Sequence, residues 1–231
     1  NKKKFWQNMI SKELQKRIIS SIILIPIAIF FILQGKLFFV SFLSIFFLAT
    51  CYEWIKMNKI NSFKIIGVFY LLFSFILAYL LRENISLGLF ILVIIICIFT
   101  DLGGYTFGKI FKGPKLTKIS PKKTYAGVFG GFILSLVAAL IYLKYTSNGL
   151  TSYFNLSILS DSNINKIYIL FVLVISLISQ IGDLIISYFK RLAKVKDTGN
   201  LLPGHGGLLD RVDGIIFAIP ASYLLIYYLI K

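Results

Sequence analysis

Long apolar runs separated by short polar segments dominate the chain. Most of them approach the ~20 residues that a helix needs to cross the hydrocarbon core of a bilayer. We expect membrane-spanning helices over residues 18–33, 37–55, 64–81, 85–107, 125–143, 167–189 and 213–230. The first is short, and a further re-entrant helix in 145–166 or 190–212 stays open. The pattern predicts an all-α, polytopic integral membrane helical bundle with about seven transmembrane helices and no soluble domain.

Composition supports the membrane assignment. The chain has 231 residues, of which 58% are hydrophobic and 15% charged. Soluble domains are nearer half apolar and a quarter charged. A net charge of +16 often indicates nucleic-acid binding, but here the basic residues lie in short runs between apolar segments, which disfavours that class. Cys51 and Cys97 lie inside apolar segments and are interpreted as buried hydrophobic residues.

We divide the chain into a basic amphipathic segment 1–17, N-terminal transmembrane helices over 18–100, and a C-terminal catalytic transmembrane region over 101–231. The first segment suits an interfacial helix whose basic face meets anionic headgroups. A signal peptide is the alternative for the start of the chain. No small-residue cleavage site follows residues 18–33, so an uncleaved first span is favoured.

The basic residues also predict the orientation. With a cytoplasmic N-terminus, the inside segments 1–17, 56–64, 108–124 and 190–212 hold 20 Lys and Arg, and the outside segments hold 5. The positive-inside rule prefers this arrangement. The two polar loops 108–124 and 190–212 are therefore expected on the cytoplasmic side, within reach of nucleotides.

Residues 187–213 are the most polar stretch near the C-terminus. Five basic residues, three carboxylates, the only histidine and four glycines fall within 27 positions. Cations suit phosphates, carboxylates suit a divalent metal, and closely spaced glycines let backbone N–H groups approach an anion. The single His205 has no second histidine or cysteine in this loop, which disfavours a zinc site.

Two aspartates, Asp101 and Asp183, lie within or at the ends of apolar segments. Ionisable groups there are costly, so a functional role is the default, and a helix-end residue reaching water is the alternative. Polar residues recur around Asp183 at steps of three and four: Ser176, Ser179, Gln180, Asp183, Ser187 and Lys190. One face of that helix must therefore look into a cleft or the bundle interior. If the last span is helical from its start, Asp210 and Asp213 share a face and could converge with Asp183 on a metal.

The loop 108–124 and its flanks carry a second set of candidates. Gly104 with Gly108, and Gly127 with Gly131, form GxxxG pairs, which favour close helix packing. The stretch from Gly104 lacks the spacing of a phosphate-binding P-loop. Donors at the start of the next helix, at Lys122, Lys123 and Thr124, suit a phosphate, although ordinary positive-inside lysines are an equal alternative.

The residues between 187 and 213 resemble the signature of the phosphatidate cytidylyltransferases, or CDP-diacylglycerol synthases. The signature positions are filled without a gap by Ser187, Lys190, Arg191, Lys196, Asp197, Gly199, Leu202, Pro203, His205, Gly206, Gly207, Asp210, Arg211 and Asp213. Upstream, Asp101, Gly108, Lys109, Ser120, Pro121, Lys123, Thr124, Gly182, Asp183 and Leu184 are also similar to the family. One departure is Ala126, where many members have Glu. The resemblance covers roughly the half from Asp101 onward, and the first hundred residues contribute only hydropathy.

The resemblance implies that CTP and phosphatidic acid give CDP-diacylglycerol and pyrophosphate, with Mg²⁺ as cofactor and a second cation left open. The implied catalytic residues are Asp183, Lys190, Arg191, Lys196, Asp197, His205, Asp210, Arg211 and Asp213. The implied substrate-binding residues are Asp101, Ser120, Lys123, Thr124, Ser187, Gly206 and Gly207. The implied metal ligands are Asp183, Asp210 and Asp213.

The expected partners are the two substrates and the lipid bilayer, with no nucleic acid, and a homodimer is left open. The expected location is a membrane, the inner membrane if the source is bacterial, with the active site on the cytoplasmic side. Two other classes stay open: a CDP-alcohol phosphotransferase-like enzyme and an ion-coupled transporter or flippase. The former motif continues with aspartates that residues 215–230 lack, and no inverted repeat supports the latter.

Overall fold

The computed structural model describes residues 19–20, 22–117, 120, 123–147, 164–202, 204 and 206–230. The predicted interfacial segment 1–17 and His205 lie outside these residues. Helices account for the regular secondary structure in the described part, apart from two isolated β-bridges, Lys115 with Thr124 and Leu202 with Gly206. The all-α prediction is therefore confirmed.

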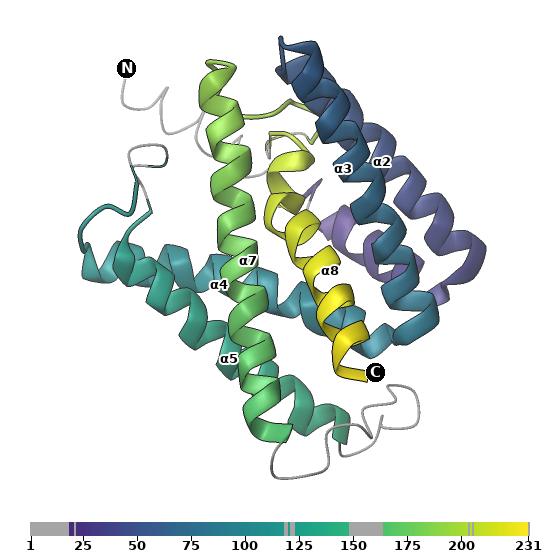
Figure 1. Cartoon of the computed structure of the whole chain (residues 1–231), viewed down its shortest axis with the longest axis vertical. Coiled ribbons are helices and arrows are strands. Elements are labelled where there is room, and N and C mark those ends of the chain that lie inside the picture. The colour runs from purple at the N-terminus through teal and green to yellow at the C-terminus, as the bar shows by residue number, and fades with distance from the viewer. Residues whose placement is uncertain are drawn as a thin grey trace. The chain divides into compact units, whose positions relative to one another are not determined.

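The chain enters the described region with a short apolar helix, Ile22–Gln34. Figure 1 shows the α-helices that follow: α2 (Lys36–Met57), α3 (Asn61–Leu80), α4 (Leu87–Phe111), α5 (Tyr125–Ser147), α7 (Ile164–Leu192) and α8 (Leu209–Ile230). A π-helical turn, η1 (Leu81–Ile85), follows α3.

Five of the described helices are long and apolar enough to cross a membrane: Lys36–Met57, Asn61–Ile85, Leu87–Phe111, Tyr125–Thr146 and Lys166–Leu192. Large apolar side chains point outward on each of them, including Leu37, Phe69, Ile98, Phe129 and Leu170. Such surfaces are costly in water and suit lipid. The protein is a polytopic helical membrane protein, as the hydropathy pattern predicts.

The chain groups into two compact units, which are described separately. The first comprises Asn1–Leu71 and Ala193–Arg211, and the second comprises Leu72–Leu192 and Val212–Lys231. Each unit therefore combines segments that are distant in the sequence.

In the first unit, the end of α2 lies beside the start of α3 (Figure 1). The indole Nε1 of Trp54 donates a hydrogen bond to the carbonyl of Phe63, at 3.0 Å. Gly67 faces the same indole, and a Cβ there would lie 1.9 Å from Nε1. The backbone N–H and the side chain of Asn58 both donate to the carbonyl of Trp54, which ends α2. Gly67 thus lets the two helices approach closely at this hairpin.

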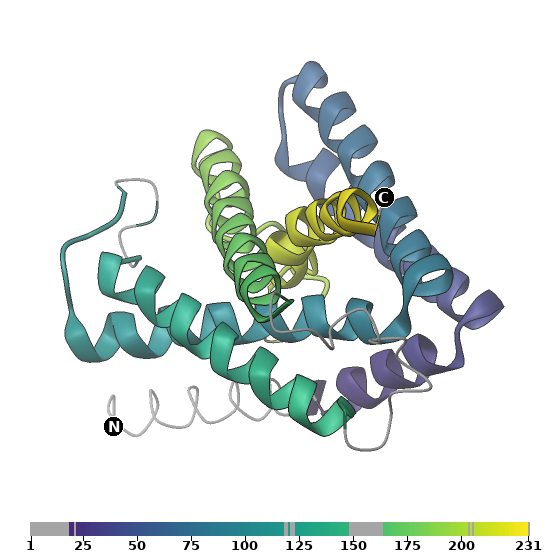
Figure 2. The same ribbon diagram turned by 60° about the horizontal axis from the view of Figure 1, so that its bottom comes forward.

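In the second unit, α4 and α5 run side by side (Figure 2). A Cβ on Gly103 would lie 2.3 Å from the carbonyl oxygen of Gly130. A Cβ on Gly127 would lie 2.7 Å from the carbonyl oxygen of Gly104. Glycines therefore line this contact, where the backbones approach too closely for a side chain. The packing role predicted for Gly127 is confirmed, whereas Gly104 has room for a Cβ, which would lie 3.8 Å from the nearest atom.

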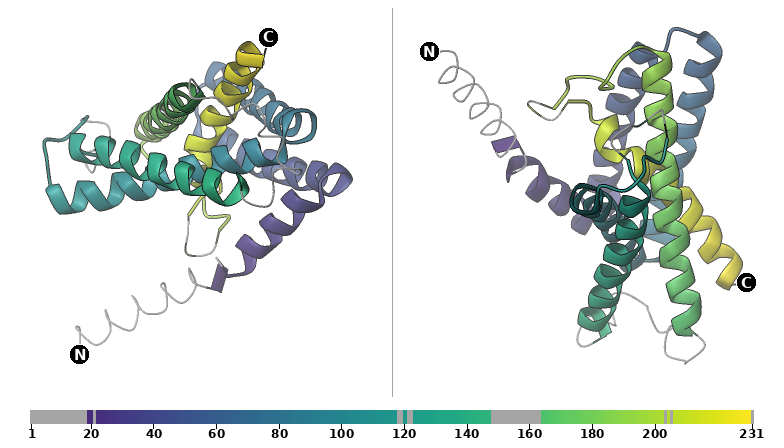
Figure 3. Two further views of the ribbon diagram at one scale, coloured as in Figure 1. Left: turned by 90° about the horizontal axis from the view of Figure 1, so that it is seen from below. Right: turned by 90° about the vertical axis from the view of Figure 1, so that its left-hand side faces the viewer.

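The second unit is completed by α7, which contacts both α4 and α5 (Figure 3). Its polar face is buried: Ser176, Ser179, Ser187 and Lys190 are all under 9% exposed. The hydroxyl of Ser176 accepts a hydrogen bond from Thr100 of α4, at 2.8 Å. The prediction that this face looks into the interior is confirmed.

Two of the helix ends that differ from the predicted spans change the position of candidate residues. α4 continues to Phe111 and is followed by Lys112 in the left-handed region at φ 47°, so Gly108 and Lys109 are helical. α8 begins at Leu209, so Asp210 and Arg211 lie in its first turn. Hydropathy places a helix end where polar residues begin, but polar residues can continue a helix beyond the bilayer.

Candidate active site

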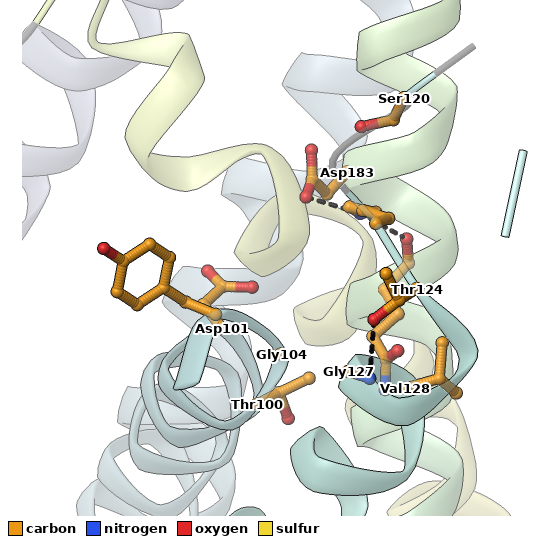
Figure 4. Close-up of a pocket in the computed structure, with 11 residues that line it drawn as sticks. Thr100, Asp101, Gly104, Ser120, Thr124, Gly127, Val128 and Asp183 are labelled. Atoms are coloured by element: carbon orange, nitrogen blue, oxygen red, sulfur yellow. Dashed lines mark hydrogen bonds and ion pairs between the residues drawn. The ribbon is translucent and has the colours of Figure 1, made fainter. Parts of the chain in front are cut away.

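A pocket of about 280 Å³ opens in the second unit, between α4, the start of α5 and α7. It is lined by Thr100, Asp101, Gly104, Tyr105, Ser120, Lys123, Thr124, Gly127, Val128, Gln180 and Asp183. Figure 4 shows Asp101 and Asp183 contributed by α4 and α7. Five residues predicted to bind substrate or metal thus meet at one pocket: Asp101, Ser120, Lys123, Thr124 and Asp183.

The segment between α4 and α5 folds back on itself to reach this pocket. The N–H of Leu116 donates to the carbonyl of Lys123 at 2.8 Å, and the N–H of Tyr125 donates to that of Pro114 at 3.2 Å. The N–H of Lys123 also donates to the carbonyl of Ser120, at 3.0 Å. These bonds fix Ser120 and Lys123 beside the pocket, directly before α5.

Thr124 is a helix cap. Its Oγ1 accepts a hydrogen bond from the N–H of Gly127, at 3.1 Å, and satisfies one of the free amides in the first turn of α5. A Cβ on Gly108 would lie 3.1 Å from the same oxygen. Thr124 therefore orients the start of α5. If Thr124 also binds substrate as predicted, its hydroxyl must serve both the Gly127 N–H and the substrate.

Lys123 and Asp183 form an ion pair across the pocket. Lys123 Nζ lies 2.6 Å from Asp183 Oδ2, and both side chains are 26% exposed (Figure 4). The other oxygen of Asp183, Oδ1, accepts a hydrogen bond from Ser187 at 3.3 Å. A predicted substrate-binding cation and a predicted metal ligand are thus direct partners.

A second aspartate approaches from α8. Asp213 is 8% exposed, and its Oδ1 accepts a hydrogen bond from the N–H of Gly214, at 2.9 Å. The charges of Asp183, Lys190 and Asp101 all act on it. Three carboxylates and the buried Lys190 therefore share one electrostatic environment. Asp183 and Asp213 both belong to the second unit, and their predicted convergence on a metal stays a prediction.

The loop 193–208 belongs to the first unit and folds around Asp210. Asp210 Oδ2 accepts hydrogen bonds from the N–H of Thr198 at 2.8 Å and from that of Gly207 at 3.3 Å. Leu202 and Gly206 exchange two backbone hydrogen bonds, which form an isolated β-bridge. Gly206 has φ 87°, a conformation that L side chains rarely adopt, and a Cβ there would lie 3.8 Å from Asp210 Oδ2.

Glu53 of α2 also binds this loop, and it is absent from the residues predicted above. Its carboxylate is 1% exposed and accepts hydrogen bonds from Thr198 Oγ1, Leu208 N and Leu209 N. No motif surrounds it in the sequence. The available signal was its charge within an apolar span, the same rule that selects Asp101 and Asp183.

The remaining predicted residues occupy these two regions or lie outside the described residues. Arg191 lies in the last turn of α7, Lys196 and Asp197 lie in the exposed part of the loop, and Arg211 lies on the exposed side of α8. A Cβ on Gly207 would lie 2.0 Å from Thr198 Oγ1 and 2.8 Å from Glu53 Oε2. The space beside Gly207 is thus filled by the protein's own side chains.

Comparison with known proteins agrees with the signature. Residues 61–229 match the cytidylyltransferase family. A phosphatidate cytidylyltransferase from Rickettsia typhi is 35% identical over 227 residues, with 92% of each chain covered. One from Rickettsia prowazekii is 36% identical over 219 residues, again with 92% of each chain covered. One from Staphylococcus haemolyticus is 32% identical over 191 residues, covering 80% of this chain and 68% of that protein. The chain belongs to the cytidylyltransferase family.

Proposed function

We propose that this protein is a phosphatidate cytidylyltransferase, which converts CTP and phosphatidic acid into CDP-diacylglycerol and pyrophosphate in phospholipid biosynthesis. The complete signature between Ser187 and Asp213 is the observation that carries this proposal. The names of its relatives agree with it, because the R. typhi and R. prowazekii proteins are phosphatidate cytidylyltransferases and match nearly the whole chain.

The reaction requires little covalent chemistry from the protein. An oxygen of the lipid phosphate bonds to the α-phosphorus of CTP, and the bond from that phosphorus to the bridging oxygen breaks, so that pyrophosphate leaves with the electron pair. The attacking phosphate is already anionic at neutral pH, so no strong general base is needed. The protein has to align the two phosphates and neutralise their charge.

The cations of the signature suit that task. Lys190 and Arg191 lie in the last turn of α7, and Lys196 lies in the loop that follows. In this proposal they hold the substrate phosphates and the leaving pyrophosphate, together with Arg211. Guanidinium groups suit phosphates because their planar fork can donate two parallel hydrogen bonds.

The carboxylates fit a divalent cation. Asp183, Asp213 and Asp101 concentrate negative charge in a partly buried region, and a cation would relieve their mutual repulsion. The described residues hold no cluster of three or more His, Cys, Asp or Glu side chains arranged as a complete metal cage. Mg²⁺ does not require one, because it usually takes one or two protein carboxylates plus water and substrate phosphates.

We assign Asp183 and Asp213 as candidate ligands from this arrangement, and Asp210 from the signature alone. When bound, Mg²⁺ would neutralise charge on the transferring group, a contribution of several kcal/mol. Asp183 Oδ2 is already paired with Lys123, so that lysine competes with a cation for the oxygen and limits the excess negative charge of the pocket.

The reaction is proposed on the cytoplasmic face of the membrane, where CTP is made available to the basic loops. The test of the function is pyrophosphate release by the purified protein in lipid. Release should require CTP, phosphatidic acid and a divalent cation together. A protein that uses CDP-diacylglycerol as its substrate, or that stays active in EDTA, would contradict the assignment.

A further inference from the structure

Glu53 is a buried carboxylate in the first unit that the proposed chemistry does not use. It lies near the end of α2 and is 1% exposed, among the buried side chains of Thr50, Trp54 and Met57. Burying a carboxylate is expensive unless hydrogen-bond donors replace its water. The groups that donate hydrogen bonds to Glu53 therefore indicate which part of the protein it anchors.

These donors all come from the signature loop and the start of α8. Glu53 Oε1 accepts from the N–H of Leu208 at 3.0 Å. Glu53 Oε2 accepts from the N–H of Leu209 at 2.8 Å and from the hydroxyl of Thr198 at 3.1 Å. α8 begins at Leu209, so its first amides are satisfied by a carboxylate of α2. A negative charge at that end is also favoured by the helix dipole.

The loop closes over Glu53 with no spare space. A Cβ on Gly199 would lie 2.6 Å from Glu53 Oε1, and a Cβ on Gly207 would lie 2.8 Å from Oε2. Both positions are glycines of the signature. Glu53 therefore leaves no room for a side chain at position 199, and Glu53 together with Thr198 Oγ1, 2.0 Å from the Cβ position, leaves none at position 207.

The same contacts reach the proposed metal ligand Asp210. The hydroxyl of Thr198 donates to Glu53, and its N–H donates to Asp210 Oδ2 at 2.8 Å. Asp210 directly follows Leu209, whose N–H is bound by Glu53. One carboxylate on α2 thus fixes both the residue that bonds Asp210 and the helical turn that carries it.

We propose that Glu53 is a positioning residue for cytidylyl transfer, which holds the loop 197–210 and the first turn of α8 in the arrangement that places Asp210. The reaction itself rests on the function proposed above. Glu53 acts through Thr198 and the α8 amides and does not contact substrate.

The primary variant is Glu53→Gln, which keeps the size of the side chain. Both oxygens of Glu53 accept hydrogen bonds, so a glutamine must turn its NH₂ group toward at least one N–H or O–H donor. We expect kcat to fall by roughly 10–100-fold, the usual effect of removing a group that orients a site ligand. KM for phosphatidic acid should stay near the parent value. Glu83→Gln, which removes a carboxylate on η1, is the matched control and should retain the parent kcat.

A second pair of variants tests the route through Thr198. Thr198→Val removes the hydroxyl at nearly constant volume, and Thr198→Ser keeps it. The serine variant should turn over near the parent rate and the valine variant more slowly. Thr198→Val should slow the parent protein clearly. Added to Glu53→Gln, the same substitution should lower the rate much less, because both substitutions break the same contact.

Hydrogen exchange of the full chain in lipid provides a readout independent of activity. In Glu53→Gln the amides of residues 197–210 should exchange faster, while those at the contact between α4 and α5 should not change. Faster exchange of this loop in Glu53→Gln than in the parent would support the positioning role of Glu53, whether or not the parent acts on CTP and phosphatidic acid. A parent that is inactive on these substrates would refute only the proposed function.

The inference is overturned if Glu53→Gln exchanges like the parent in the loop, or if its kcat per folded molecule equals that of the parent. If this variant does not fold, the Thr198 pair decides: equal rates for the valine and serine variants overturn the inference, and loss with valine but not with serine supports it.

Discussion

Lys123 Nζ lies 2.6 Å from Asp183 Oδ2 and joins the start of α5 to α7 through a pocket rather than through a packed core. Each side chain is 26% exposed. Partly exposed ion pairs stabilise a fold by only about 0–1 kcal/mol. A pair in this position is therefore better explained by the chemistry of the pocket than by stability.

Replacing Lys123 should separate these two roles. Lys123→Met is expected to reduce turnover by ~10²–10³-fold, the effect of losing a preorganised group that stabilises developing charge. The free energy of unfolding should change by no more than about 1 kcal/mol. Turnover and thermal unfolding would be measured on the same preparation. A variant that unfolds early but turns over normally would make Lys123 a structural residue.

Asp210→Asn tests charge separately from loop anchoring. Both amides that bond Asp210 reach the same oxygen, Oδ2, so the carbonyl oxygen of an asparagine can take its place. The loop should therefore stay folded while the charged ligand is lost, and turnover should fall by at least ~100-fold because the metal contribution is several kcal/mol. Kinetics at saturating CTP and phosphatidic acid measure the effect.

Two further variants complete that test. Asp183→Asn should lose turnover to a similar extent, and Asp210→Ala should also destabilise the protein, by about 1–3 kcal/mol, because it leaves the amides of Thr198 and Gly207 without their acceptor. Glu83→Gln serves again as the control. Asp210→Asn turning over near the parent rate would remove Asp210 from the catalytic set.

Metal removal should abolish activity without unfolding the protein. Asp210 and Glu53 anchor the loop through hydrogen bonds to protein groups, so EDTA should leave the helical circular dichroism and its thermal midpoint unchanged. Adding Mg²⁺ back should restore turnover. A large loss of helicity in EDTA would instead assign the cation a structural role.

The contact between α4 and α5 should not tolerate side chains at its closest point. Gly103→Ala places a Cβ 2.3 Å from the backbone of Gly130 and should destabilise the protein by about 1–3 kcal/mol, as overpacking does. Gly104→Ala is the matched control, because its Cβ would lie 3.8 Å from the nearest atom. Thermal unfolding in detergent compares the two, and equal midpoints would contradict the packing.

The charge asymmetry predicts that loops 108–124 and 190–212 face the same side. Single cysteines at Lys115 and Lys194, in a background without Cys51 and Cys97, should react with an impermeant maleimide from the cytoplasmic side. Labelling from opposite sides would contradict the predicted topology.

Most of the fold could be predicted because lipid imposes a simple rule. A chain that crosses hydrocarbon must form helices, so apolar runs locate them. The polar face of α7 was also predictable, since Ser176, Ser179 and Ser187 recur at helical spacing. The ends of α4 and α8 were not, because Lys109 and Asp210 are polar residues within helices and hydropathy does not detect them.

The sequence indicated candidate residues, but it did not indicate which of them contact one another. The signature selects the loop around Asp210 and Gly207. Glu53, which accepts hydrogen bonds from Thr198, Leu208 and Leu209, lies 154 residues upstream of Gly207 in an apolar helix, where only its charge distinguishes it. Likewise, the sequence indicates Lys123 and Asp183 separately. Their pairing depends on how α5 and α7 pack, which no local pattern determines.

The most direct test of the proposed reaction is to follow radioactive label from the α- and γ-phosphorus atoms of CTP into the products. With radioactive phosphorus at the α position, the purified protein and phosphatidic acid should transfer the label to an organic-soluble lipid that co-migrates with CDP-diacylglycerol. With the label at the γ position, it should appear only in pyrophosphate. Label from the γ position in the lipid, or no lipid labelling from the α position with Mg²⁺ and phosphatidic acid present, would contradict cytidylyl transfer.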